Sequence, residues 1–340
     1  MIITFYSKDF FLKCFFILSY NNQICGFVED FNKINMSLRI IFMGTPDFAV
    51  PTLDALVQNG YNIVGVITAT DKLGGRGGKK VLQSAIKRYA LEKELNILQP
   101  KNLKNPDFVE NLRALKADLQ VVVAFRMLPE VVWNMPPKGT INLHGSLLPK
   151  YRGAAPIHWA VINGETETGV TSFFLQHAID TGDILQKATL PIGEDDTTGD
   201  VHDKMMHLAA EVVLESVHLI ETGNYELEPQ DDSQVSKAPK IFRETCNINF
   251  DQPTSKVHNF IRGLSPFPAA WTKLDDLEFK IFRSEKEIIE HDESVGTINT
   301  DHKSYLKFAT QDGYIHALEV KMAGKRKMGI KDFLNGYKLK

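Results

Sequence analysis

Asn142 and His144 stand two residues apart in the segment Asn142-Leu143-His144-Gly145, which closes an apolar run. Side chains two apart on a strand face the same way, so this pair should project together, and Gly145 should release the chain into a loop. Acyl-type transfer needs such a pair, because an amide can donate to a developing oxyanion and an imidazole can handle protons. On spacing alone, a histidine that merely ends a strand beside a capping asparagine is the competing interpretation.

The elements that must position this pair alternate between strands and helices. Strands are expected at 38–43, 61–68, 119–124, 139–144, 169–175 and 184–192, and helices at 47–58, 83–95, 106–115 and 201–221. This order predicts an α/β fold with a Rossmann-like open, mostly parallel sheet. Ligands of such sheets bind beyond the carboxyl ends of the strands, which is where Asn142 and His144 fall.

The chain divides into two expected domains of unequal size. A catalytic domain over 37–225 is followed by a polar linker at 226–240 and a C-terminal domain at 241–340. In the last of these, short strands are expected at 271–274, 278–282, 296–298, 305–309 and 315–321. Several short strands at regular spacing predict a small OB-like β-barrel.

Residues 1–36 are expected to be a dispensable N-terminal extension, with the folded protein beginning near Met36. Their apolar run Phe10–Leu18 is interrupted by Lys13. The run is also shorter than the roughly 20 residues that span a bilayer, and no small-residue cleavage site follows it. A short leader or anchor is the alternative.

Composition excludes several classes of protein. The chain has 340 residues, of which 43% are hydrophobic and 24% charged, which excludes collagen-like, disordered and small disulfide-stapled proteins. A net charge of −3 means that any nucleic-acid surface must be local. The three cysteines form no CxxC motif and no cluster with histidines, so no metal site is expected and a reducing, cytoplasmic compartment is favoured. No membrane partner is expected either.

The loop after His144 extends the pattern. Ser146-Leu147-Leu148-Pro149 follows directly, and Asp180 lies 36 residues beyond His144. Taken together, these residues resemble the folate-dependent formyltransferases, in which an Asn-x-His pair leads into Ser-Leu-Leu-Pro and an aspartate follows at this distance. The resemblance implies that Asn142, His144 and Asp180 are catalytic and that 10-formyltetrahydrofolate is the formyl donor. The cofactor-binding residues that it implies are Ser146, Leu147, Leu148, Pro149, Phe125, Met127 and Leu128.

Other motifs concern the formyl acceptor. Met43–Ala49, Tyr151–Pro156 and the C-terminal barrel resemble the branch of the family that acts on methionyl-tRNA. The glycinamide ribonucleotide branch lacks the barrel, although Phe125–Pro129 is closer to that branch. Formyl transfer to a small-molecule amine, such as that ribonucleotide or an amino-sugar nucleotide, stays an alternative. A non-enzymatic RNA-binding protein on the same scaffold is the other.

Two basic segments could contact tRNA. The protein is expected to be a monomer. Asp71–Lys80 carries four glycines and predicts a mobile loop with its cations at Lys72, Arg76, Lys79 and Lys80. By resemblance, Arg76 reaches the acceptor end. Residues 321–340 hold seven Lys or Arg against one acid and include Lys325, Arg326 and Lys327. A solvated loop and a solubilising tail are the plain alternatives.

The expected reaction is attack of the methionyl α-amine on the formyl carbon, with tetrahydrofolate leaving. Asn142 is assigned to the formyl oxygen. His144 either stabilises the oxyanion or shuttles protons, and Asp180 orients His144 or a water.

Overall fold

The computed structural model describes residues 38–74 and 78–339. The expected extension at 1–36 and the expected tRNA contact Arg76 therefore lie outside the described residues. Within the described ranges, no helix is both long enough and apolar enough to cross a bilayer.

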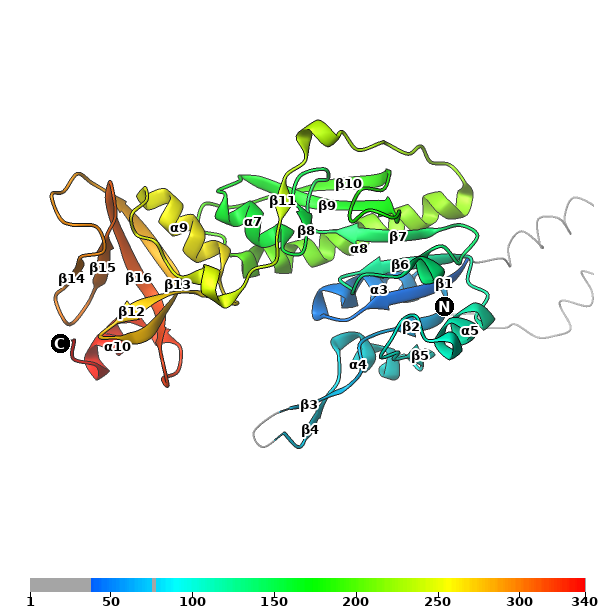
Figure 1. The fold of residues 1–340 in the computed structure, drawn as a ribbon, viewed down its shortest axis with the longest axis horizontal. Coiled ribbons are helices and arrows are strands. Elements are labelled where there is room, and N and C mark those ends of the chain that lie inside the picture. Colours follow the sequence, from blue (N-terminus) through cyan, green and yellow to red (C-terminus); the bar gives the residue numbers. More distant parts are fainter. Residues whose placement is uncertain (1–37, 75–77, 340) are drawn as a thin grey trace, which may run out of the picture.

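The first unit is built on a seven-stranded sheet in the order β10-β9-β7-β6-β1-β2-β5 (Figure 1). Five neighbouring strands, from β7 to β5, run parallel, whereas β9 pairs antiparallel with β7 and with β10. The prediction of a mostly parallel sheet is confirmed. Its strands are β1 (Arg39–Gly44), β2 (Asn62–Ile67), β5 (Ile97–Leu98), β6 (Leu119–Val123), β7 (Thr140–His144), β9 (Glu167–Phe174) and β10 (Ile184–Pro191).

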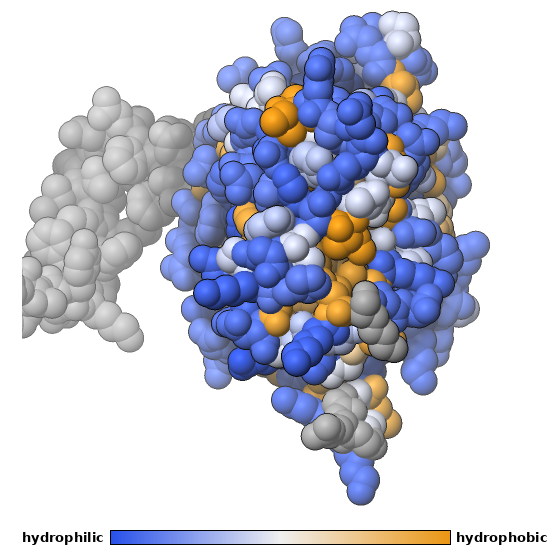
Figure 2. Space-filling model, turned by 90° about the vertical axis from the view of Figure 1, so that its left-hand side faces the viewer, coloured by the Kyte–Doolittle hydropathy of each residue, from blue (hydrophilic) through white to orange (hydrophobic). Residues whose placement is uncertain are grey.

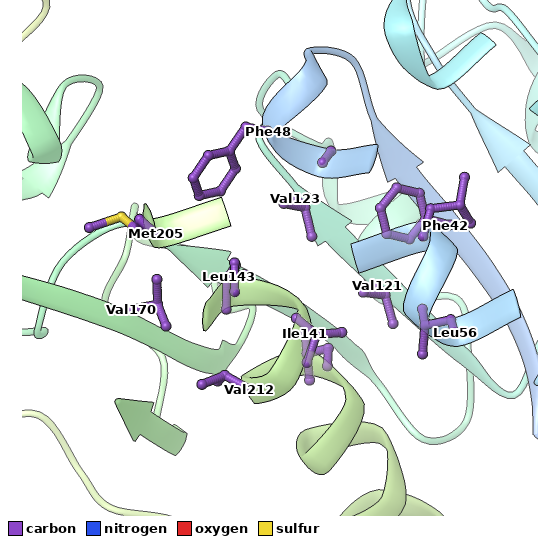
Figure 3. Packing of buried hydrophobic residues seen from close by; sticks show 14 of the residues in the cluster. Phe42, Phe48, Leu56, Val121, Val123, Ile141, Leu143, Val170, Met205 and Val212 are labelled. Carbon is purple, nitrogen blue, oxygen red and sulfur yellow. The ribbon is translucent and has the colours of Figure 1, made fainter. Parts of the chain in front are cut away.

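Helices cover both faces of this sheet, which explains why its central strands are apolar throughout. Alternate residues of β1 enter opposite clusters: Ile40 and Phe42 pack with residues of α3 and α8, and Ile41 and Met43 pack with residues of α5. Figure 3 shows the first cluster, with Phe42 near Leu56 of α3. The helical segments are η1 (Asp47–Ala49), α3 (Val50–Gln58), α4 (Ala85–Glu92), α5 (Pro106–Ala114), α6 (Glu130–Trp133), α7 (Pro156–Ile162) and α8 (Thr198–Thr222).

Two helices differ from expectation for local reasons. The helix expected at 47–58 begins as the 3-10 turn η1 before α3. The helix expected at 201–221 starts earlier, because Thr197 accepts from the Asp200 amide while the Asp200 carboxylate accepts from the Thr197 amide. This reciprocal capping box sets the start of α8 at Thr198.

The second unit is a six-stranded antiparallel sheet that curls into a half-barrel. The antiparallel pair of β13 and β16 lies at the centre of this sheet, and both strands are longer than expected. Phe250 stacks on Phe308 with ring centroids 4.7 Å apart at its centre. The elements are η3 (Arg243–Cys246), α9 (Thr254–Gly263), β12 (Ala270–Leu274), β13 (Leu277–Ile288), β14 (Ile298–Thr300), β15 (Leu306–Ala309), β16 (Gly313–Met322), β17 (Met328–Gly329) and α10 (Ile330–Gly336).

Helix α9 joins the two units. The Thr198 hydroxyl donates to the Gly263 carbonyl at 2.7 Å, and Arg262 Nη1 donates to the Asp196 carbonyl at 2.9 Å. His258 is buried beside this contact, with Nδ1 3.0 Å from the Ser284 hydroxyl. Burial lowers the pKa of His258 from its ordinary value, and nearby Arg262 lowers it further.

Acidification should therefore weaken this junction. The unfolded chain protonates His258 near pH 6.5, whereas the folded protein keeps the imidazole neutral to lower pH, so stability is lost as pH falls below about 6.5. Tm measured from pH 8 to pH 5 should fall less steeply in His258→Asn, which places an amide near Nδ1 and cannot titrate. Parallel curves for the two proteins would contradict this expectation.

Candidate active site

A cavity of about 620 Å³ opens beyond the carboxyl ends of β6 and β7. Val122 and Asn142 are register partners in these parallel strands, so both chains leave the sheet side by side. The walls come from the loops after β1 and β6, from the end of β7 and from the turn that ends at Asp180. The cavity thus lies at the carboxyl ends of the strands, where the sequence analysis predicted a ligand site.

Asn142 and His144 both line this cavity from the end of β7. Among the described residues, the half-buried Asn142 amide has no hydrogen-bond partner, so it is free to donate into the cavity. The buried His144 has Nε2 2.9 Å from the Tyr151 carbonyl oxygen. A carbonyl can only accept, so Nε2 carries the proton and Nδ1 is left with a lone pair.

Asp180, in the turn between β9 and β10, completes the group. Its Oδ2 lies 3.8 Å from His144 Nδ1, which is close enough for charge attraction and too long for a hydrogen bond. The same oxygen accepts from the Gly153 amide at 2.9 Å. The three residues expected to be catalytic are therefore brought together, with the carboxylate held by the backbone at Gly153.

The turn that carries Asp180 is held by Gln230, a residue that sequence analysis did not select. Gln230 Nε2 donates to the carbonyls of Asp180, at 3.0 Å, and Gly182, at 2.8 Å. Its Oε1 accepts from Arg152 Nη2 at 2.7 Å. Gln230 belongs to the segment 226–240, which was expected to be a linker.

That segment folds onto the active site. Its strand β11 (Lys237–Ala238) pairs with β8 (Arg152–Gly153), and the Ser236 hydroxyl accepts from the Tyr151 amide at 2.9 Å. A Cβ at Gly153 would lie 2.6 Å from the Ala238 carbonyl oxygen, so only glycine allows this close approach. The linker residues thus position both Tyr151, which orients His144, and the Asp180 turn.

Gln230→Ala should lower kcat by about tenfold, because small misplacements of reacting groups cost this much or more. Tm and the KM for the formyl acceptor should change little. Gln234→Ala is the matched control, since Gln234 is exposed and its side chain donates to Asp231 rather than to the Asp180 turn. Equal kcat values in the two variants would show that Gln230 does not position the Asp180 turn.

The chain matches two family models, described as formyl transferase over residues 38–217 and formyl transferase, C-terminal domain, over residues 240–338. A curated methionyl-tRNA formyltransferase from Parabacteroides distasonis is 55% identical over 88% of this chain and 96% of its own length. The Bacteroides fragilis protein of that name is 52% identical over 89% and 96%. This chain belongs to the methionyl-tRNA formyltransferase family.

Solved structures share the fold of this formyltransferase at low sequence identity. The Helicobacter canadensis N-formyltransferase in complex with folinic acid and dTDP-3-aminofucose has a TM-score of 0.63 and 21% identity, covering 85% of this chain and all of its own. HypX from Aquifex aeolicus in complex with tetrahydrofolic acid has a TM-score of 0.60 and 20% identity, covering 89% and 49%.

The residues expected to bind folate separate into two groups in this formyltransferase. Phe125, Met127 and Leu128 line the cavity. Ser146, Leu147, Leu148 and Pro149 are not among the residues that line it. The Leu148 amide instead donates to the Thr171 hydroxyl of β9 at 3.1 Å, so this segment packs against the sheet next to the end of β7. Lining residues that were not among the expected folate contacts include Pro46, Phe48, Trp133, Ile157 and His202.

The described residues of the glycine-rich segment include two paired strands in this formyltransferase. Where a mobile loop was expected, β3 (Lys72–Gly74) pairs with β4 (Lys80–Leu82) in a hairpin that projects from the first unit (Figure 1). Lys72, Lys79 and Lys80 are exposed on it, as are Lys325, Arg326 and Lys327 in the turn between β16 and β17. Over 38–74 and 78–339, no cluster of three His, Cys, Asp or Glu side chains could hold a metal ion.

Proposed function

We propose that this protein transfers the formyl group of 10-formyltetrahydrofolate to the α-amine of methionyl-tRNA, which yields formylmethionyl-tRNA. The observation that carries the proposal is the convergence of Asn142, His144 and Asp180 on one cavity. That convergence occurs in a chain 55% identical to a curated enzyme of this name.

The described side chains suit the transfer of an acyl group to an amine. Attack by the amine nitrogen on the formyl carbon puts negative charge on the formyl oxygen, where the unpartnered Asn142 amide can donate. The amine must lose one proton, and the leaving N10 nitrogen must gain one. His144 Nδ1 has the free lone pair to accept the first and, once protonated, can supply the second.

Asp180 supports this proton transfer through its charge. When Nδ1 is protonated, the imidazolium lies 3.8 Å from the Asp180 carboxylate in a mostly buried pocket, so their attraction is only weakly screened. A strong base is not needed, because the α-amine of an aminoacyl ester is less basic than an alkyl amine. Positioning and oxyanion stabilisation are then the main contributions of the protein.

The cavity has the character that a reduced pterin and its aromatic linker require. Phe125, Leu128 and Trp133 supply apolar wall, and about 620 Å³ is within the usual range for sites of small ligands. The bound folate supplies an activated formyl group. The protein supplies a hydrogen-bond donor, Asn142, and a base, His144.

The surface offers two places for the tRNA backbone. The hairpin of β3 and β4 presents three exposed lysines together with exposed Leu73 and Val81, and the turn at 325–327 presents three more cations. The end of the molecule formed by the second unit is largely hydrophilic, with only a few apolar patches (Figure 2). Phosphate contacts of this kind should be sensitive to salt.

Formylation of purified methionyl-tRNA by the protein with 10-formyltetrahydrofolate tests the proposal. Formyl incorporation should require a free α-amine, so tRNA charged with N-acetylmethionine is the matched control. Glycinamide ribonucleotide and an amino-sugar nucleotide should be poor acceptors in the same assay. Preferred formylation of either small amine would establish the alternative activity instead.

The proposal also takes the enzyme to be a cytoplasmic monomer. Size-exclusion chromatography with light scattering, with and without tRNA, measures the mass of the free protein and of the complex. A dimeric mass at working concentration would contradict the monomer.

A further inference from the structure

A second cavity, of about 640 Å³, adjoins the catalytic one. The two cavities share Arg126, Met127 and Leu128 as a common wall. The far side of the second cavity is the segment Lys101–Lys104, between β5 and α5. Both sides therefore lie at the same carboxyl edge of the sheet as the catalytic group.

This second cavity is cationic. Its lining contains Lys101, Lys104 and Arg126 against a single carboxylate, Glu130. In the described part of the chain, none of the three cations forms an ion pair, whereas Glu130 lies 3.6 Å from His177 Nε2.

Arg126 is held in place without losing its charge. Its Nη1 donates to the Lys101 carbonyl at 3.0 Å, and its Nη2 donates to the Pro100 carbonyl. Carbonyl oxygens fix the guanidinium but carry no net charge, so the positive charge stays available to an anion. Next to it, Met127 is 72% exposed and offers apolar surface between the two cavities.

We propose that this second cavity binds the γ-linked glutamate chain of a polyglutamylated folate donor. The inference rests on the proposed function, because it needs folate in the adjoining cavity. A donor whose formyl group lies between Asn142 and His144 extends in two directions, as a neutral pterin and as an anionic benzoylglutamate. The apolar cavity suits the pterin, and the cationic cavity suits a chain with one free carboxylate per added residue.

The shared wall favours this occupant over an RNA phosphate. A glutamate chain is covalently joined to the ligand of the first cavity, so it enters the second at high effective concentration. Each exposed ion pair contributes modestly, and three together predict about tenfold tighter binding of the longer ligand. The preference should shrink with salt, because Lys101, Lys104 and Arg126 are all exposed.

The test compares tetrahydrofolate monoglutamate and pentaglutamate by isothermal titration, and the two formyl donors by steady-state kinetics. The full-length protein should bind the pentaglutamate about tenfold more tightly. In the double variant Lys101→Gln/Lys104→Gln, that ratio should fall toward one. Lys116→Gln is the control, since Lys116 is exposed at the opposite edge of the sheet, where its carbonyl accepts from Arg39.

Equal affinity of the wild-type protein for both chain lengths would overturn the proposal. The proposal would also be overturned if the double variant had a raised KM for tRNA and kept the preference for pentaglutamate, because Lys101 and Lys104 would then bind RNA. Failure of the proposed function looks different: the preference in titration would persist, and neither donor would support formylation of methionyl-tRNA.

Discussion

Asn142→Ala should lower kcat for formylation of methionyl-tRNA by about 10²–10³-fold, the usual cost of removing one oxyanion donor. The Asn142 amide has no partner among the described residues, so its loss leaves nothing unpaired in the fold. Stability should therefore be nearly unchanged while turnover collapses. Rapid-quench formylation with saturating donor and tRNA gives the rate, and thermal unfolding checks the fold.

The control for this variant is Asn111→Ala, which removes an exposed amide from α5, outside the cavity. Its kcat should equal that of the wild type. An Asn142→Ala enzyme that turns over within about threefold of wild type would refute the assignment of Asn142 to the formyl oxygen.

Asp180→Asn should lower kcat by about 10²-fold, because the variant removes the charge that faces His144 Nδ1 but keeps an oxygen for the Gly153 amide. Comparison with His144→Ala shows whether Asp180 acts through His144 or independently of it. If the carboxylate acts through the imidazolium, the double variant should be little slower than His144→Ala alone, since groups that act as a unit are not additive.

Multiplicative losses in that double variant would contradict the mechanism. They would mean that Asp180 contacts the substrate or a water independently of His144. The KM for tRNA should stay constant in all three proteins, because none of the proposed phosphate contacts is altered.

The placement of Asn142 and His144 was predictable because their relation is local. Asn142 and His144 lie on one strand whose alternation fixes their common face, and the strand order places its end at the ligand-binding edge. Asp180 required the family resemblance, since no periodicity connects it to β7. The sheet was predictable because apolar runs such as β6 pack between two layers of helices.

Other features depend on contacts that sequence periodicity does not encode. Gln230 acts through two backbone carbonyls about 50 residues away, in a segment whose polar composition indicated only a linker. The glycines in 71–80 suggested a loop, whereas the structure pairs Leu73 with Val81 across two short strands. Ser146–Pro149 follows the catalytic strand directly, yet it packs behind the site because Leu148 is buried against Phe173 and Ile184.

The pairing of β11 with β8 bears on how this enzyme can be divided. Helix α8 ends at Thr222, where a protein engineer would cut to obtain a stand-alone catalytic module. Such a cut would discard Gln230, Ser236 and Ala238, all of which brace the catalytic turns. A chimera that exchanges the second unit should therefore be spliced after Ala238, so that these residues stay with the first unit.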